Sequence, residues 1–311
     1  PISFGSFLTV SYRQTGRSRS VSKGRIMKAL SGFYYVDSGD GRTVTCKGRG
    51  KLRHQKVTPL VGDRVEITCN EDLTGTVDAI LPRINQFRRP MVANIQQMVI
   101  IASGAIPITD PFLIDRMITI AESKKSTPII CFNKCDLITE EQKKELEDIY
   151  KPAGYDIIFT SAKQGINLEG LKELLKGKTT AVAGPSGVGK SSLINQLQDS
   201  VYMETGTISE KIERGKHTTR HSEIIPLGDE AYIMDTPGFS SMDVPGFEKE
   251  DLWTCYPEFL PHEPYCKFQG CSHINEPNCG VKDALAEGGI SPVRYENYKL
   301  LYEELRQIKK Y

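Results

Sequence analysis

Hydrophobic residues in the first part of the chain occur in short runs that turn residues separate. Ser31-Gly32, Gly62-Asp63 and Thr74-Gly75 are such turns, and each lies beside a run rich in Val, Ile, Tyr or Thr. The predicted strands are Arg25–Leu30, Phe33–Val36, Thr43–Lys47, Arg64–Cys69 and Thr76–Ile80. Five short strands within residues 24–88 are typical of a small all-β barrel, and we expect an OB-fold.

The pattern changes from residue 89 onward, where apolar runs alternate with amphipathic segments. The predicted strands are Gln97–Ala102, Pro128–Phe132, Asp156–Thr160, Thr180–Ala183 and Tyr232–Met234. The predicted helices are Phe112–Ser123, Glu140–Tyr150, Leu168–Leu175 and Ser191–Leu197. Short, continuously apolar strands are typical of a parallel sheet that is covered on both faces. Residues 89–242 are therefore predicted to form a three-layer α/β domain of the nucleotide-binding type.

The two ends of the chain show different patterns. Past residue 243, cysteine and histidine cluster between helical segments, and Tyr295–Lys310 is predicted to end the chain as an amphipathic helix. We therefore expect a third, mainly α-helical domain over residues 243–311. Residues 1–23 show no clear period, and the first twenty of them are rich in serine and arginine. They are predicted to be an extension outside the folded domains.

The chain has a formal net charge of only +1, but its charges are unevenly distributed. Arg13–Lys56 contains twelve Lys or Arg and two Asp, a net charge of +10, which leaves −9 for the remainder. Such asymmetry indicates a polyanion-binding region, although a solvated basic surface would give the same count. Basic residues concentrate around the Gly48–Lys56 loop, where OB barrels often bind nucleic acid. RNA binding is therefore predicted for the barrel; the alternative is a β domain that only packs against its neighbour.

Composition also indicates the cellular compartment in which the protein acts. The sequence has no run near the ~20 apolar residues of a membrane span and no visible secretory signal. Of the eight cysteines, four are scattered and three cluster near the C-terminus. This distribution indicates a reduced compartment and one metal site rather than a disulfide framework. We expect a cytoplasmic protein that has no membrane partner and acts as a monomer.

A complete phosphate-binding loop follows the predicted strand Thr180–Ala183. Its residues are Gly184, Pro185, Ser186, Gly187, Val188, Gly189, Lys190 and Ser191, and Ser192 continues into the helix as a further nucleotide-site residue. The glycines let main-chain N–H groups surround the phosphates, and the helix N-terminus favours negative charge. Lys190 is predicted to contact the β- and γ-phosphates of the nucleotide. The Ser191 hydroxyl is predicted to bind Mg²⁺.

Two further motifs predict that the base is guanine. Asn133, Lys134, Cys135 and Asp136 match the NKxD signature, and Ser161, Ala162 and Lys163 match the SAK signature. The Asp136 carboxylate can accept hydrogen bonds from guanine N1–H and the 2-amino group, a pair that adenine lacks. The Ala162 N–H is predicted to face guanine O6. Taken alone, the NKxD tetrapeptide is also compatible with a polar turn after a strand.

The residues predicted to surround the γ-phosphate and the metal come later in the chain. Asp235-Thr236-Pro237-Gly238 follows a predicted strand. Asp235 is therefore predicted to bind Mg²⁺ through water, and the Gly238 N–H to contact the γ-phosphate. Thr218 or Thr219 is the candidate switch threonine, and the sequence leaves open which of them binds the metal. The same stretch is also compatible with a flexible basic loop.

Phe239 follows this motif, at the position where many GTPases have a glutamine that orients the attacking water. An aromatic ring cannot polarise a water molecule, so intrinsic GTP hydrolysis is predicted to be slow. His217 is the nearest residue in the motifs that can position the nucleophile. The alternative is a group that a partner supplies, as arginine fingers are supplied in other systems.

Three cysteines and one histidine lie within fourteen residues near the C-terminus: Cys266, Cys271, His273 and Cys279. Three sulfur ligands and one nitrogen suit tetrahedral Zn²⁺, and four protein ligands are typical of a structural site. The spacing is not that of a common zinc finger, so four buried, unligated residues are the alternative. We expect one zinc ion, whose removal should loosen this region.

The order of the motifs is unusual, because the guanine motifs precede the phosphate loop, whereas in ordinary small GTPases they follow it. The chain is therefore predicted to be circularly permuted. With the Cys266–Cys279 cluster after them, the motifs resemble one family, the bacterial small-ribosomal-subunit-dependent GTPases known as RsgA or YjeQ. The resemblance covers nearly the whole chain from about Gly24 onward.

The resemblance implies an N-terminal OB domain, a permuted GTPase domain and a C-terminal zinc domain. It also implies hydrolysis of GTP to GDP and phosphate, stimulated by the 30S subunit, during late maturation of that subunit. The implied partners are the 30S subunit and its 16S rRNA. Two alternatives remain: a GTP-gated RNA-binding factor in which occupancy carries the function, and a phosphotransferase kinase. The guanine motifs and the lack of an evident acceptor domain in the sequence argue against the kinase.

The permuted order also suggests how nucleotide binding is coupled to the rest of the chain. The GTPase domain ends just after Asp235–Phe239, so the predicted switch continues directly into the C-terminal domain. Ordering of the switch by the γ-phosphate is therefore predicted to reposition that domain. GTP would then favour the subunit-bound arrangement, and hydrolysis would favour release.

Overall fold

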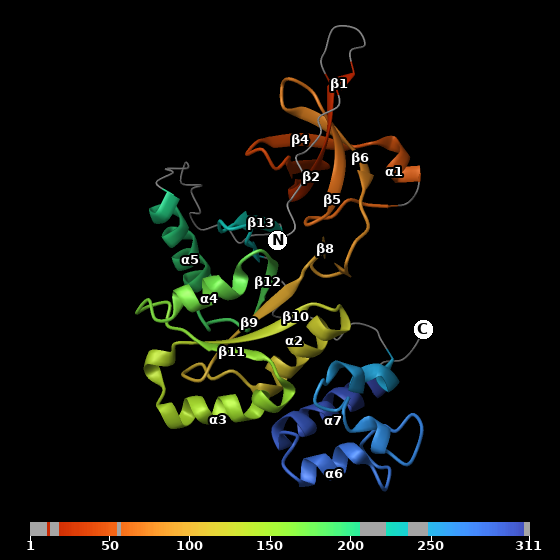
Figure 1. The fold of residues 1–311 in the computed structure, drawn as a ribbon, viewed down its shortest axis with the longest axis vertical. Helices are drawn as coiled ribbons and strands as arrows, with labels where there is room; N and C mark the ends of the chain where they lie inside the picture. The colour runs from red at the N-terminus through yellow and green to blue at the C-terminus, as the bar shows by residue number, and fades with distance from the viewer. Residues whose placement is uncertain (1–10, 13–18, 55–56, 206–221, 236–247, 308–311) are drawn as a thin grey trace, which may run out of the picture. The chain divides into compact units, whose positions relative to one another are not determined.

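The computed structural model describes residues 11–12, 19–54, 57–205, 222–235 and 248–307, which form two compact units (Figure 1). The first unit contains the residues up to Ile95 together with most of β13 (Glu223–Pro226), which pairs with β2. The second unit begins at Gln96 and contains both the α/β region and the C-terminal helices. None of the helices in these ranges is both long and apolar enough to span a membrane.

Five strands of the first unit close into a barrel. They are β2 (Arg19–Leu30), β3 (Phe33–Asp37), β4 (Thr43–Gly48), β5 (Arg64–Cys69) and β6 (Thr74–Ile80). The strands pair in the order β2-β3-β4-β6-β5, and an antiparallel pairing of β5 with β2 closes the ring. Alternate side chains point inward, as Val65 and Ile67 of β5 do, so the period of two builds the barrel core. The predicted OB-type barrel is confirmed.

The barrel begins earlier than the sequence pattern predicted. Strand β2 starts at Arg19, and its residues from Ser20 to Lys23 pair with β5. The two-residue strand β1 (Ser11–Tyr12) pairs with the same end of β2. Residues 19–23 were predicted to lie outside the fold because this part of the sequence shows no clear period, and most of their side chains are polar. Strand pairing uses main-chain groups, so this polar stretch extends the ladder without adding to the core. A short helix, α1 (Gly50–His54), lies within the predicted Gly48–Lys56 loop.

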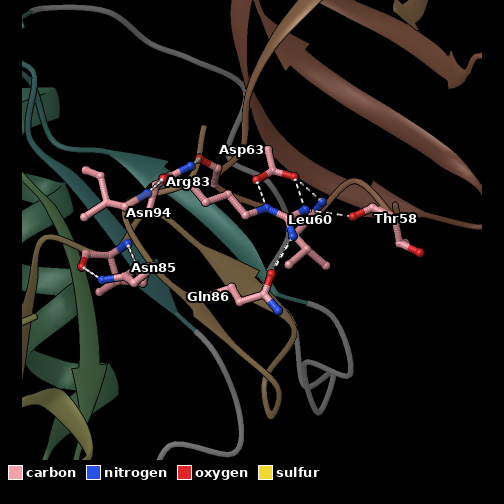
Figure 2. Close-up of polar contacts among 10 residues, drawn as sticks. Thr58, Leu60, Asp63, Arg83, Asn85, Gln86 and Asn94 are labelled. Atoms are coloured by element: carbon pink, nitrogen blue, oxygen red, sulfur yellow. Dashed lines mark hydrogen bonds and ion pairs between the residues drawn. The ribbon is translucent and has the colours of Figure 1, made fainter. Parts of the chain in front are cut away.

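A buried ion pair fixes the chain where it leaves the barrel (Figure 2). The Asp63 carboxylate is fully buried and accepts from Arg83 Nε and Nη2, each at 2.7 Å, and from the Leu60 N–H at 2.7 Å. Arg83 Nη2 also donates to the Thr58 carbonyl at 2.8 Å. A buried charge is tolerated when its partner and its hydrogen bonds are complete, as they are here. Beyond Arg83 the chain forms the small hairpin of β7 (Gln86–Phe87) and β8 (Val92–Ala93).

The second unit is built on a sheet whose strands are β9 (Gln97–Ser103), β10 (Thr127–Asn133), β11 (Asp156–Phe159), β12 (Thr179–Ala183) and the first half of β14 (Tyr232–Asp235). The order in space is β11-β10-β9-β12-β14, and the pairings of β9, β10, β11 and β12 are parallel. Every residue of β9 and β12 is buried, as expected for strands covered on both faces. The carboxyl ends of parallel strands meet at one edge, where ligands bind.

Helices cover both faces of this sheet: α2 (Pro111–Ser123), α3 (Glu140–Tyr150), α4 (Leu168–Leu175) and α5 (Lys190–Thr205). Figure 1 shows α4 and α5 on one side of the sheet and α2 and α3 on the other. Val99 and Ile101 of β9 share a core with α4 and α5, while the alternate residues of β9 face α2. The predicted three-layer α/β fold is confirmed. Helix α5 continues well beyond the predicted end at Leu197.

The C-terminal region contains α6 (Gly280–Ala286), α7 (Pro292–Gln307) and the short 3₁₀ helices Lys249–Cys255 and Glu263–Tyr265. Its core is aromatic, with the rings of Tyr256, Phe259 and Tyr298 in mutual contact. Phe112 of α2 packs against the same core. The C-terminal helices therefore belong to the same compact unit as the α/β sheet.

A fully buried arginine ties α7 to α2. Arg294 donates to the carboxylates of Asp115 and Glu258, and Asn297 donates to the second oxygen of Asp115. The guanidinium also lies 4.8 Å from the centroid of the Tyr256 ring. Two carboxylates thus share one guanidinium, and burial raises the pKa of Asp115 to about 6 although Arg294 and Asn297 lower it.

Candidate nucleotide site and metal centre

The phosphate loop connects β12 to α5, as predicted. At Gly184 the backbone φ is +142°, and a Cβ there would lie 2.2 Å from the Ile101 carbonyl oxygen, so no side chain fits. Lys190 Nζ donates to the carbonyls of Gly184 at 2.8 Å and Pro185 at 2.6 Å. The ammonium is therefore held over the loop, beside the N-terminus of α5. A main-chain concavity with a fixed cation is an arrangement that binds phosphates.

Asn133 joins the guanine motifs to the phosphate loop. Its side chain is buried at the end of β10, where Nδ2 donates to the Val188 carbonyl at 2.8 Å. Its Oδ1 accepts from the Ala162 N–H at 3.0 Å. A Cβ at Gly189 would lie 2.4 Å from Asn133 Nδ2, so glycine there permits the contact. One side chain thus holds three loops that are far apart in the sequence.

The NKxD and SAK residues lie at the carboxyl edge of the sheet. Lys134 has a left-handed backbone with φ of +63°, and Asp136 follows in a 3₁₀ turn, Cys135–Leu137, with an exposed carboxylate. The buried Cys135 donates its N–H to the Thr160 carbonyl at 3.0 Å, which fixes the turn against the neighbouring loop. Burial raises the pKa of the Cys135 thiol, so it remains protonated and packs as an apolar group. The neighbouring Asp136 carboxylate is accessible to a base because it is exposed.

One contact of the SAK loop differs from the predicted one. Ser161 is fully buried and accepts from the Gln164 N–H at 3.2 Å, and Lys163 is exposed. The Ala162 N–H was predicted to face guanine O6, but in this structure it donates to Asn133 Oδ1. If guanine O6 bound here, it would either share the Ala162 N–H with Asn133 Oδ1 or replace Asn133 Oδ1 as the acceptor.

A loop without a recognised motif completes the site. It follows β9, and its Ile106 carbonyl accepts from Lys134 Nζ at 3.1 Å. Pro107 lies beside the phosphate loop, since a Cβ at Gly187 would be 3.2 Å from its ring. No sequence motif marks these residues, because Ile106 contributes only a carbonyl oxygen, which every residue carries.

The predicted Mg²⁺ and switch residues are only partly described. Ser191 and Ser192 lie in the first turn of α5 with exposed side chains, and Asp235 is the last residue of β14. His217, Thr218, Thr219 and Gly238 lie outside the described residues, as does Phe239. Their predicted roles stay predictions.

The four predicted metal ligands converge. One ligand atom from each of Cys266, Cys271, His273 and Cys279 lies within 4.8 Å of the others. His273 Nδ1 faces the sulfurs of Cys266 at 3.5 Å and Cys279 at 3.4 Å. Burial lowers the pKa of His273 and raises the pKa of the Cys271 and Cys279 thiols. The imidazole is therefore neutral, as a ligand must be, while the buried thiols deprotonate only if a cation is present. The cluster thus fits a metal ion.

Three residues that are not themselves predicted ligands hold this cluster in place. The hydroxyls of Tyr295 and Tyr298 in α7 donate to the carbonyls of His273 at 2.6 Å and Ser272 at 2.7 Å. The Glu276 carboxylate accepts from the Ser272 N–H at 3.0 Å and the Ile274 N–H at 3.2 Å. Such contacts orient the ligating residues before a metal binds.

Comparison with known proteins identifies the family. The RsgA N-terminal domain family matches residues 23–77, and the RsgA GTPase family matches residues 80–245. The protein "Small ribosomal subunit biogenesis GTPase RsgA" of Agathobacter rectalis is 59% identical, with 93% of this chain and 99% of that protein covered. The protein of the same name from Alkaliphilus metalliredigens is 44% identical, with 94% and 100% covered.

Two solved structures show the same architecture. YjeQ from Thermotoga maritima matches with a TM-score of 0.82 at 36% identity, covering 93% of this chain and 100% of that one. YloQ, described as a circularly permuted GTPase, matches with a TM-score of 0.80 at 35% identity, covering 94% and 97%. The predicted permutation is confirmed. The chain belongs to the RsgA family and is a circularly permuted GTPase with an N-terminal β-barrel domain.

Proposed function

We propose that this chain hydrolyses GTP to GDP and phosphate during late maturation of the small ribosomal subunit, with its turnover stimulated by the 30S subunit. The supporting observation is the position of Asn133, which connects both guanine motifs to the phosphate loop. The relatives are named for small-subunit biogenesis, which supports the ribosomal role. That role would place the chain in the cytoplasm, where it would act as a monomer.

The nucleotide would be held by residues of the guanine motifs, of the phosphate loop and of the predicted switch segment. Asp136 would accept from the guanine base, and Lys190 would contact the β- and γ-phosphates. Ser191, Asp235 and Thr218 or Thr219 would hold Mg²⁺, which bridges the phosphates and offsets the charge that develops on them. The Gly238 N–H would contact the γ-phosphate. The Cys266–Cys279 cluster would hold one structural Zn²⁺, because thiolates with a neutral imidazole suit that ion.

The attacking water would need a group that positions it. Phe239 cannot do so, and His217 is the nearest candidate in this chain by motif. If the 30S subunit supplied the group instead, His217→Ala would hydrolyse GTP at the parental rate both alone and with 30S subunits. A large loss of the stimulated rate, with GTP binding unchanged, would support the histidine.

The barrel would provide contacts to 16S rRNA. Its five-stranded closed form and the net charge of +10 over Arg13–Lys56 support this role, because sequence-independent RNA binding depends on phosphate neutralisation. Binding through this surface should weaken steeply with salt.

The experiment that tests the proposed function is GTP turnover by the purified chain with and without isolated 30S subunits. ATP and 50S subunits serve as controls for the base and for the subunit. We expect strong stimulation with GTP and 30S subunits only. Equal turnover with and without 30S subunits would contradict the proposal.

A second candidate function follows from Phe239, because a slow intrinsic rate is also what an occupancy switch requires. In that case the GTP-bound form would bind the 30S subunit, and hydrolysis would only reset it. Affinity for 30S subunits with GDP and with a non-hydrolysable GTP analogue distinguishes the cases. Equal affinity would rule out nucleotide-gated binding.

A further inference from the structure

A groove of about 550 Å³ lies on the outer surface of the barrel and is lined by residues of strands β4 and β6. The inward residues of β4, such as Val44 and Cys46, are buried, so the alternate residues point outward into the groove. The side chains that matter for its chemistry are Phe33, Lys47, Arg49, Asn70, Thr76 and Asp78. A concavity of this volume is large enough for a nucleotide.

Phe33 is the exposed aromatic residue of the groove, with 36% of its surface accessible. The Lys47 ammonium lies over its ring, 4.9 Å from the centroid. A cation over an exposed ring is held weakly, so a nucleobase can take its place. The released ammonium then remains within reach of the phosphate attached to that base.

Arg49 is held over the same groove by an acidic residue. Its Nη1 donates to the Asp78 carboxylate at 3.1 Å, and the same carboxylate accepts from the hydroxyls of Thr68 at 2.6 Å and Thr76 at 3.1 Å. The Arg49 side chain is still 63% exposed, so its other N–H groups face solvent. A guanidinium fixed on one side and open on the other is suited to phosphate.

We propose that this groove binds one unpaired nucleotide of single-stranded RNA, with the base stacked on Phe33 and its phosphates on Lys47 and Arg49. Asn70 and the threonine hydroxyls along the rim supply hydrogen bonds to the base edge. An acidic peptide fits less well, because an exposed aromatic ring beside two cations is the combination that single-stranded nucleic acids use. The proposal rests on the ribosomal role proposed above and assigns its RNA contact to particular residues.

The test is binding of a fluorescein-labelled ten-nucleotide oligouridylate to the full-length chain, measured by anisotropy over a range of salt. Phe33→Leu keeps an apolar side chain but removes the stacking face, so we expect about a tenfold loss of affinity. Phe33→Trp should bind as tightly as the parent. Lys47→Ala should weaken binding and reduce the salt slope by about 0.7, the value for one single-strand phosphate contact.

The matched control is Lys23→Ala, which removes an equal charge from an exposed lysine of β2 outside the groove. If Lys23→Ala and Lys47→Ala weakened binding equally, the site would be a diffuse basic surface. If Phe33→Leu bound as tightly as Phe33→Trp, no base would stack there. If a ten-base-pair duplex competed as well as the single strand, the groove would contact only the sugar-phosphate backbone of the RNA. Each of these results would overturn the proposal.

The RNA assay contains neither GTP nor ribosomal subunits, so its outcome is independent of turnover. If the chain binds oligouridylate as expected but 30S subunits do not stimulate its turnover, the groove proposal stands and the proposed function fails. If 30S subunits stimulate turnover but oligouridylate does not bind in the groove, the proposed function stands and the RNA contact lies elsewhere.

Discussion

At Asp136, the proposed choice of base depends on two hydrogen bonds from guanine to one exposed carboxylate. Asp136→Asn would replace one acceptor with a donor, which clashes with the 2-amino group of guanine but pairs with the 2-oxo group of xanthine. We expect affinity for GTP to fall by about a hundredfold or more and affinity for XTP to rise correspondingly. Competition binding with both nucleotides measures the change. Asp148→Asn, an exposed aspartate of α3, should alter neither affinity.

Gly189 tests the link between the phosphate loop and the guanine motifs. A Cβ there would lie 2.4 Å from Asn133 Nδ2, and moving that amide aside would break its bond to the Val188 carbonyl. Gly189→Ala should therefore lower GDP affinity by about tenfold or more, the loss expected for a buried hydrogen-bonded link. Gly177→Ala is the matched control, because Gly177 also has a positive φ but its Cβ would meet nothing within 4 Å. Both should lose about 1 kcal/mol of stability from backbone strain. If they bound GDP equally well, the link would be unimportant.

Residues proposed to bind the nucleotide could be predicted because the ligand's chemistry specifies them. A phosphate needs a cation and main-chain N–H groups, and the guanine edge needs a carboxylate, so Lys190 and Asp136 stand out in a sequence. Residues that hold the motifs together were not predictable. The bond from Asn133 to Val188 depends on two loops that meet only in the fold. The Ile106 carbonyl has no side-chain signature at all.

Among the elements, apolar runs predicted strands and helices well wherever both faces of the sheet are covered. Helix α3 has the predicted bounds, Glu140–Tyr150, and a capping box formed by Thr139 and Gln142 stabilises its start. The pattern failed where pairing needs no buried side chain, as at Arg19–Lys23 of β2. It also gave no indication that α7 would pack on α2 through a buried charge.

That charge cluster determines how firmly α7 is docked. Arg294→Met would leave the Asp115 and Glu258 carboxylates buried without a counter-charge, so we expect a loss of about 3–5 kcal/mol. Trp253, the chain's single tryptophan, lies 5.8 Å from the His273 ring and reports unfolding of this region by fluorescence. Arg306→Met removes an exposed arginine from the same helix, and urea unfolding should shift by about 0.5 kcal/mol at most. Equal shifts for the two variants would show that the cluster contributes little.

The same cluster should make stability depend on pH. Burial raises the pKa of Asp115 to about 6 from its ordinary value of 3.8, so the folded protein takes up a proton in this range. The stability that this group contributes is complete below pH 4 and is lost as the pH rises through 6. The unfolding free energy of the parent should therefore fall, relative to Asp115→Asn, between pH 4.5 and 7. A difference that does not change with pH would mean that Asp115 is ionised throughout.

On the scale of the whole molecule, the packing of α7 limits how the C-terminal region can respond to nucleotide. Helix α2 begins just after the loop whose Ile106 carbonyl contacts Lys134. The same helix contains Asp115, which accepts a hydrogen bond from Arg294 of α7. The C-terminal region can therefore move as a body only if α2 moves with it or the buried cluster breaks. The predicted repositioning by the switch would have to take one of these two routes.

The position of α7 also couples its docking to the metal centre. Tyr295 and Tyr298 of this helix hold the His273 and Ser272 carbonyls, and Arg294 of the same helix holds Asp115 of α2. If one helix supports both contacts, loosening either must weaken the other, because linkage is reciprocal. With zinc bound as proposed, Arg294→Met should therefore release the ion to a colorimetric chelator about tenfold faster than the parent, the loss typical of removing support behind metal ligands. Arg306→Met should release zinc at the parental rate. If the two variants released zinc equally fast, the metal loop would be stable independently of the docked helix, and the C-terminal region would then be free to change position without losing its ion.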